Sequence, residues 1–295
     1  RINNAANNEI MATFVANGAV TLNYDNASKL ATTATGIDVT GISVSDGMST
    51  NTLGTSNFIA GVNAGNSIES GGNYNTVVGD EAGTAITTGD YNVGVGYDSL
   101  LRTTTGERNS AFGSFALFTN ISGANNVANG FQSLYNNTAN YNTAVGSLSL
   151  QKNTTASNNT AVGYNSLYAN TTGTNNVALG SSAGAALTTG SSNILIGSNT
   201  GDALTTANEN VAVGHFSMSN NVLGAKNVAI GASTLSATNP ASAVDMHNVA
   251  VGFQAGNAVT TGTNNTLIGG LAGDAITTGV QNVATGAYAL TSNTT

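Results

Sequence analysis

Cysteine and tryptophan are absent from this 295-residue chain, proline occurs once, and charged residues make up only 7% of it. The lack of cysteine excludes disulfides and thiolate metal sites. Ordinary domains carry about 25% charged residues, so hydroxyl and amide groups must form most of the polar surface of this protein. Low charge also occurs in disordered chains, but the chain is 40% hydrophobic at regular spacing, which favours an ordered fold.

The few charges that are present are mostly negative. Fourteen Asp and Glu against six Lys and Arg give a formal net charge of −8, which opposes the counterion release on which nucleic-acid binding depends. No apolar run approaches the ~18 residues that a membrane-spanning helix needs. We therefore expect neither a nucleic-acid partner nor insertion into a membrane.

What the sequence has instead is a repeat, which is the first feature to look for in such a chain. An Asn with a Gly four positions later recurs in thirteen copies, and ten of the twelve steps between copies are 17 residues long. The asparagines are Asn75, Asn92, Asn109, Asn126, Asn142, Asn159, Asn176, Asn193, Asn210, Asn227, Asn248, Asn265 and Asn282. The turn glycines are Gly79, Gly96, Gly113, Gly130, Gly146, Gly163, Gly180, Gly197, Gly214, Gly231, Gly252, Gly269 and Gly286.

Each copy has the composition of a short strand followed by a turn. The recurring Gly indicates a backbone position with positive φ, or a corner too tight for a Cβ atom. Before it, β-branched residues alternate with Ala, as in Val211-Ala212-Val213, and this alternation indicates a strand that buries one face. Leu or a second Gly follows four residues later, and many copies close with Thr-Thr-Gly.

This pattern predicts an all-β fold, because helical repeats need about 20 to 45 residues with few Gly or β-branched residues. Seventeen residues fit one coil of a parallel β-roll, with two short strands and two tight turns per coil. At about 4.8 Å per coil, thirteen coils make a rod of about 60 Å. We expect the Asn column to form a side-chain ladder that caps turn amides.

The Asn-x-Val-Ala-Val/Ile-Gly units are clearest at Asn210–Gly214, Asn227–Gly231 and Asn248–Gly252. They resemble the head repeats of trimeric autotransporter adhesins, and the resemblance spans residues 57–295. It implies a left-handed parallel β-roll in a homotrimer. The adhesin repeats are shorter than 17 residues, so the Thr-Thr-Gly half-coil has no counterpart in them.

The segment before the repeats is different. The sequence of Ala16–Gly41 resembles a module found in bacteriophage tail-fibre and structural proteins, notably of marine and cyanobacterial phages. Residues 1–56 predict strands at Ile10–Val15, Ala19–Tyr24, Gly36–Val39 and Ile42–Val44. We interpret residues 1–56 as a cap and trimerisation collar, and residues 57–295 as the β-roll, with Asn57–Gly65 as a degenerate first coil.

One repeat is longer than the others. The copy that starts at Asn227 carries four extra residues and the only proline. Insertions in repeat proteins map to surface loops, so we expect an exposed loop that contains Asn239, Pro240, Asp245 and His247. Because Thr295 falls inside the last coil, we also expect this chain to be part of a longer fibre.

Catalytic and metal-binding patterns are sparse. His215 and His247, the two histidines, occupy different phases of different coils, without partners at a suitable spacing for a base or a metal. Asp80, Glu81 and Asp98 are too scattered for a paired-carboxylate glycosidase site. We expect no enzyme activity and no cofactor, while a structural calcium stays open.

Aromatic residues recur one or two positions after the turn glycine. As a stripe they suit two roles, packing between subunits of a trimer or stacking on sugar rings, and we favour the first. With two residues of the Leu column, the candidate interface or receptor stripe comprises Tyr97, Phe115, Phe131, Leu134, Tyr164, Leu167, Phe216, Phe253 and Tyr288.

These observations favour a structural protein. Our leading hypothesis is the homotrimeric shaft of a phage tail fibre or capsid fibre, located in the virion, that contacts other virion proteins and a host-surface receptor such as a glycan. The alternative is the head of a bacterial trimeric adhesin on the cell surface. A third class, a tailspike-type enzyme, would need a groove lined by carboxylates.

Overall fold

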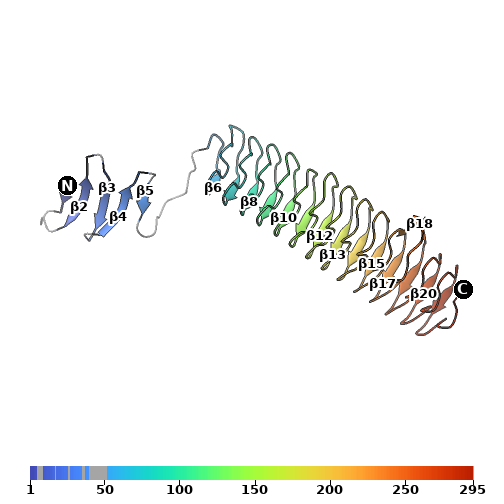
Figure 1. The fold of residues 1–295 in the computed structure, drawn as a ribbon. Coiled ribbons are helices and arrows are strands. Elements are labelled where there is room, and N and C mark those ends of the chain that lie inside the picture. Colours follow the sequence, from blue (N-terminus) through green and yellow to red (C-terminus); the bar gives the residue numbers. More distant parts are fainter. Residues whose placement is uncertain (5–8, 17, 26, 35–36, 40–51, 295) are drawn as a thin grey trace. The chain divides into compact units, whose positions relative to one another are not determined.

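The computed structural model describes residues 1–4, 9–16, 18–25, 27–34, 37–39 and 52–294. The chain forms two compact units, Arg1–Met48 and Ser49–Thr295 (Figure 1). The boundary thus falls a few residues before the one predicted at residue 56. Every regular element in the described ranges is a β-strand.

The first unit is a single five-stranded antiparallel sheet with strand order β1-β2-β3-β4-β5. The predictions for β2, β3 and β5 are confirmed to within one residue at each end, while β1 and β4 were missed. The segment Ile42–Val44 lies outside the described residues. The strands are β1 (Ile2–Asn3), β2 (Ile10–Phe14), β3 (Val20–Tyr24), β4 (Ala27–Thr32) and β5 (Ile37–Val39).

The second unit is a parallel β-solenoid, as predicted, and its ladder has 14 strands. Equivalent residues pair from coil to coil, for example Ala144 with Ala161. The ladder strands are β6 (Phe58–Ala60), β7 (Thr76–Val78), β8 (Val93–Val95), β9 (Ser110–Phe112), β10 (Val127–Asn129), β11 (Thr143–Val145), β12 (Thr160–Val162), β13 (Val177–Leu179), β14 (Ile194–Ile196), β15 (Val211–Val213), β17 (Val228–Ile230), β19 (Val249–Val251), β20 (Thr266–Ile268) and β21 (Val283–Thr285).

The prediction of two strands per coil is wrong, because each coil contributes one three-residue strand to this ladder. The rest of the coil consists of turns with left-handed backbone. Around Asn142, for example, Tyr141, Leu148 and Leu150 have φ of 60°, 62° and 48°. Such a conformation costs a non-glycine residue about 1–3 kcal/mol. It is held here because the same three amides donate to carbonyls of neighbouring coils over 2.9–3.1 Å.

Both predictions for the turn glycines, a positive φ and a corner too tight for a Cβ atom, are confirmed. All thirteen have φ between 119° and 141°, a region that L-residues with side chains avoid. A Cβ added to Gly146 would also lie 2.5 Å from the carbonyl oxygen of Gly163 in the next coil. These glycines therefore set both the turn and the close approach of successive coils.

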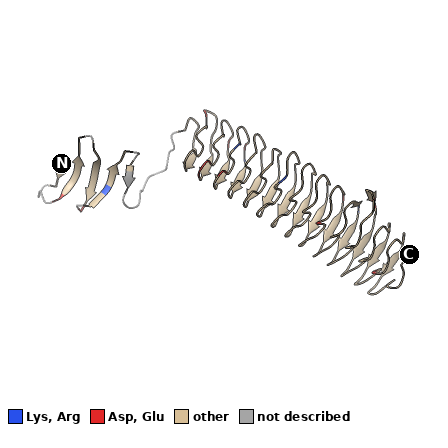
Figure 2. Ribbon diagram, in the orientation of Figure 1, with Lys and Arg blue, Asp and Glu red and all other residues tan. Residues whose placement is uncertain are grey.

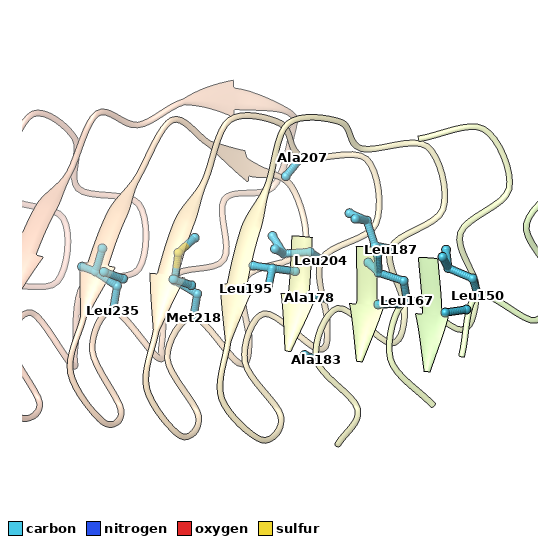
Figure 3. Close-up of a cluster of buried hydrophobic side chains, with 14 of the residues drawn as sticks. Leu150, Leu167, Ala178, Ala183, Leu187, Leu195, Leu204, Ala207, Met218 and Leu235 are labelled. Atoms are coloured by element: carbon cyan, nitrogen blue, oxygen red, sulfur yellow. The ribbon is translucent and has the colours of Figure 1, made fainter. Parts of the chain in front are cut away.

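The core is narrow and closed within one chain. The middle residue of each strand faces inward and is in most coils an Ala, such as Ala144, which has no exposed surface. The Leu column stacks beside it (Figure 3). Leu134 and Leu167 are fully buried, so their assignment to a subunit interface is wrong. The β-branched residues on either side of the middle residue face outward.

The solenoid contains two kinds of coil, distinguished eight and eleven residues after the coil's Asn. Leu coils have Leu or Met at the first position and Asn or Thr at the second, as in Leu134 and Asn137. Gly coils have Gly at the first position and Ile, Leu or Val at the second, as in Gly184 and Leu187. Leu coils start at Asn92, Asn109, Asn126, Asn142, Asn159, Asn210, Asn227 and Asn282; Gly coils start at Asn57, Asn75, Asn176, Asn193, Asn248 and Asn265.

The side chains eight and eleven residues after the coil's Asn compensate for each other in volume. In most Gly coils the apolar side chain from the later position, together with a large side chain at the middle of a strand, fills the space of the missing Leu. A Cβ on Gly83 would lie 2.6 Å from Cγ1 of Val77 and 2.8 Å from Cδ1 of Ile86. A Cβ on Gly201 would lie 2.8 Å from Cδ1 of Leu204. Protein interiors tolerate few voids, and this exchange keeps every coil filled.

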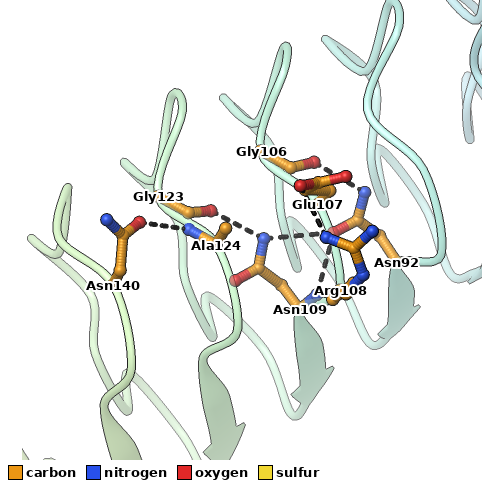
Figure 4. Close-up of polar contacts among 8 residues, drawn as sticks. All are labelled: Asn92, Gly106, Glu107, Arg108, Asn109, Gly123, Ala124 and Asn140. Carbon is orange, nitrogen blue, oxygen red and sulfur yellow. Dashed lines mark hydrogen bonds and ion pairs between the residues drawn. The ribbon is translucent and has the colours of Figure 1, made fainter. Parts of the chain in front are cut away.

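The predicted Asn ladder is confirmed. The Oδ1 atom of Asn92 accepts hydrogen bonds from the backbone N–H and the Nδ2 of Asn109, both at 3.1 Å. Nδ2 of Asn109 also donates to the carbonyl of Gly123 over 2.8 Å (Figure 4). The column is buried, so its amides satisfy backbone groups that water cannot reach.

A second Asn ladder was not predicted. It is formed by the later position of consecutive Leu coils, where Asn153 donates to Asn137 over 2.7 Å and Asn170 donates to Asn153 over 2.9 Å. The sequence signal was present as a second Asn column eleven residues after the first. It was obscured because the Gly coils interrupt it.

Candidate functional site

The outward face of the solenoid ladder is a uniform surface that runs along all 14 strands. Its two columns consist of the residues that flank the middle of each strand. At about 4.8 Å per strand and a width of about 10 Å, its 14 strands cover about 600 Å². The first column is Phe58, Thr76, Val93, Ser110, Val127, Thr143, Thr160, Val177, Ile194, Val211, Val228, Val249, Thr266 and Val283, and the second is Ala60, Val78, Val95, Phe112, Asn129, Val145, Val162, Leu179, Ile196, Val213, Ile230, Val251, Ile268 and Thr285.

None of these residues is charged. Most are aliphatic or Thr, and several remain accessible in the single chain, as with Ile196 at 37% and Ile230 at 40% exposure. We call this surface the outer sheet face. Contiguous apolar surface of this size is at the upper end of what monomeric soluble proteins show, and larger patches mark interaction sites.

The predicted aromatic stripe is brought together only in part. Tyr97 and Phe131 both pack edge-on against Phe115, with ring centroids 5.3 and 6.1 Å away. Phe118 and Tyr135 join them in a parallel stack at 4.8 Å. We call these five residues the ring cluster. Tyr164, Phe216, Phe253 and Tyr288 lie in other coils and are exposed; Phe216 packs against His215, with ring centroids 4.0 Å apart.

Two cations border the aromatic residues. The guanidinium of Arg102 lies 5.5 Å from the Phe118 ring, and the Lys152 ammonium lies 4.8 Å from the Tyr168 ring, within the range of cation–π attraction. Sequence reasoning missed both contacts. Their signal was the shared spacing, since each cation precedes its ring by sixteen residues (118 − 102 and 168 − 152).

The long coil forms a local addition to the solenoid. Strands β16 (Gly224–Ala225) and β18 (Val244–Asp245) pair in parallel as a separate sheet. Nζ of Lys226 donates to a carboxylate oxygen of Asp245 over 2.6 Å. Residues 241–245 are exposed, as are Asn239 and His247, whereas Pro240 is buried. The prediction of an exposed loop thus holds for three of the four named residues and is wrong for Pro240.

Charged residues are sparse along the ribbon (Figure 2), but the carboxylates of Asp80, Glu81 and Asp98 lie near enough to affect one another. Burial, followed by the charge of Glu81 and a smaller effect of Asp80, raises the pKa of Asp98. The Asp98 charge in turn raises the pKa of Tyr97. Glu81 accepts a 2.7 Å hydrogen bond from Asn63. Within the described ranges, no group of three or more His, Cys, Asp or Glu side chains is arranged to hold a metal ion.

The hollows of the surface are shallow. One of about 490 Å³ lies at the first coil and is lined by neutral residues, among them Leu53 and Ile59. Another of about 470 Å³ lies on the N-terminal sheet and includes Glu9 and Asp25. Glu9 accepts a hydrogen bond from Asn4 there. The described segments include no helix with the length and apolar character to cross a bilayer.

Comparison with protein-family models, curated protein sequences and solved structures finds no match to this chain. Any functional assignment therefore rests on the geometry of the chain and on the motifs in its sequence.

Proposed function

We propose that this chain is the structural shaft of an extracellular fibre, a tail fibre or capsid fibre of a virion, which carries host-surface recognition and has no enzyme activity. The observation that supports this most directly is the uninterrupted ladder of 14 strands, whose coils are closed by buried Asn, Leu and Ala columns. Such a rod holds its ends at a fixed separation. The resemblance of Ala16–Gly41 to phage modules favours a virion, and that of the strand units to adhesin heads supports the alternative of a bacterial surface adhesin.

The shaft is proposed to be a homotrimer associated through the outer sheet face. This face is uncharged and mostly apolar, and three copies that each bury about 600 Å² of it remove about 1,800 Å² in total from water, an area typical of specific assemblies. In a trimer each copy divides this face between its two neighbours. The ring cluster then lies just past the turn glycines, outside the ladder, where it is available to a host receptor such as a glycan.

Sedimentation of the full chain tests this assembly. The wild-type mass should be near three times 29.2 kDa. The variant Ile196→Asp with Ile230→Asp buries charge on the outer sheet face, and it should dissociate to monomers or lose solubility. Phe253→Asp is the matched control, because Phe253 is 57% exposed in the aromatic stripe, and it should leave the trimer intact. A trimer lost only in the control would assign the interface to the stripe.

Localisation tests the biological setting. Antibodies against this chain should label fibres on virus particles in negatively stained preparations from a sample that contains the native protein. Label on bacterial cell envelopes would instead support the adhesin. Depolymerisation of a surface polysaccharide by the purified chain would overturn the proposal that it is purely structural.

A further inference from the structure

The N-terminal sheet carries one continuous apolar face. Strand register aligns Ile2 with Ala12, Ala12 with Leu22, and Leu22 with Leu30 across four strands. Opposed residues in antiparallel strands project to the same side. Residues two positions along a strand share a face, and they add Phe14, Val20 and Ile37. We call this surface the inner sheet face.

The opposite side of the same sheet differs in chemistry. Thr13 pairs with Thr21, and Thr21 pairs with Ala31, so this row is small and mostly polar, although Met11, two positions before Thr13, adds an apolar side chain to the same side. An antiparallel sheet with one apolar and one polar face normally packs its apolar face against a second layer. The sequence of residues 1–39 therefore encodes a sheet that is suited to being covered on one side.

No second layer is present among the described residues of this unit. Ile2, Phe14, Leu22 and Ile37 remain 52%, 57%, 47% and 65% exposed, and Ala12 is the one buried hydrophobic residue among those described before residue 49. A sheet needs a packed hydrophobic face for independent stability. The inner sheet face thus requires an occupant other than the described residues of this unit.

The size of the face favours copies of this chain over a foreign partner. Five strands of two to six residues cover about 300 Å², well below the ~800 Å² that each partner buries in a stable complex. Copies already joined through their solenoids are held at high effective concentration, so a small contact suffices for them. The face also carries no charge, and identical copies would not repel one another.

We propose that the inner sheet faces of the associated copies pack on one another and form a shared second core, separate from the contact between solenoids. This inference rests on the proposed homotrimer. It assigns the residues through which the predicted collar would hold the copies together. They are Ile2, Phe14, Val20, Leu22, Leu30 and Ile37.

Single cysteines in the full chain test the proposal, because the chain has none of its own. Leu22→Cys places a thiol on the inner sheet face, and Thr21→Cys, its neighbour in β3, places one on the opposite side. After mild oxidation, Leu22→Cys should form disulfide-linked dimers at least ten times faster than Thr21→Cys. Circular dichroism and sedimentation of both reduced variants verify that they fold and assemble.

The outcomes separate this inference from the proposed assembly. If both variants are trimers and cross-link at equal rates, the solenoid trimer stands and the packing of the inner sheet faces is wrong. If Leu22→Cys is protected from a maleimide reagent but does not cross-link, the face is covered by another part of the molecule, which also overturns the inference. If the chain sediments as a monomer, the assembly itself is wrong.

Discussion

The Leu coils and the Gly coils build the same cross-section by opposite routes. A Leu coil fills the core from the left-handed position eight residues after its Asn, and a Gly coil fills it from the position three residues later. In the Leu coils the freed later position carries buried Asn or Thr, which in neighbouring coils form a second polar ladder. The comparison teaches that the repeat conserves volume at the core, while the identity of each residue varies.

The largest loss of stability should come from removing the buried Leu side chain of a Leu coil. Leu134→Gly removes a fully buried side chain, and we expect a loss of about 2–5 kcal/mol in the free energy of unfolding. Adding Asn137→Leu converts the coil to the Gly type and should recover about 1–3 kcal/mol of this loss. Chemical denaturation of both single variants and the double variant measures the coupling.

If the two substitutions change the free energy of unfolding additively, the two positions do not share one space. The proposed equivalence of the Leu and Gly coils would then be wrong. The reverse conversion provides a control in the Gly coil that starts at Asn193. There Gly201→Leu alone would meet Leu204 and Leu195, and Leu204→Asn should relieve part of that overpacking.

The next effect should be equal in the two kinds of coil. Asn92 in a Leu coil and Asn193 in a Gly coil make equivalent contacts within the first Asn ladder: each accepts from the backbone N–H of the next Asn and donates to a backbone carbonyl. Either one changed to Ala leaves a buried amide and a buried carbonyl unpaired, at a cost of about 1–3 kcal/mol for each group. Denaturation should therefore give similar losses for both variants.

Asn136→Ala serves as the control for this pair, because its side chain is outside both ladders, and it should change stability little. A much larger loss of stability at one ladder position than at the other would show that the first Asn ladder contributes unequally to stability in the two kinds of coil.

The smallest effect concerns a Gly coil only. Burial raises the pKa of Asp202, and its Oδ1 has no hydrogen-bond partner. A raised carboxyl pKa means that the folded protein binds the proton more tightly, so the ionised form costs stability at neutral pH and the cost disappears as the pH falls through the folded-state pKa. Asp202→Asn should thus be slightly more stable than wild type at pH 7 and lose this advantage near pH 4. Thermal melts across this range measure the difference, and a constant difference would contradict it.

The sequence predicted those features that repeat with a strict period. The Asn and Gly columns identified the coil, its length and the buried ladder, because each position has a single backbone requirement. The 14-strand ladder followed from them. In the N-terminal unit, alternation located three strands but not β4, whose Ala-Ser-Lys start has low β propensity.

Other features depend on packing that a local pattern does not contain. Alternation in Val211-Ala212-Val213 shows that two sides of the strand differ but not which side is buried. In this Leu coil the buried side holds the small Ala, whereas Leu195 and Leu267 fill the same position in Gly coils. Left-handed backbone at Leu148 or Tyr141 is imposed by neighbouring coils against local preference. Of the predicted aromatic stripe, Tyr97, Phe115 and Phe131 come together, whereas the outer sheet face was hidden because its residues resemble core.

The direction of the hydrogen bonds determines how a single chain of the rod bears load. The strands lie across the rod, so the bonds of the ladder run along it, as between Val127 and Asn142. A pull along the axis therefore opens the end coil first, one short strand at a time, and leaves the next coil intact. Each released coil of 17 residues lengthens from about 5 Å to about 55 Å. The solenoid would thus yield stepwise under tension and absorb work without breaking a covalent bond.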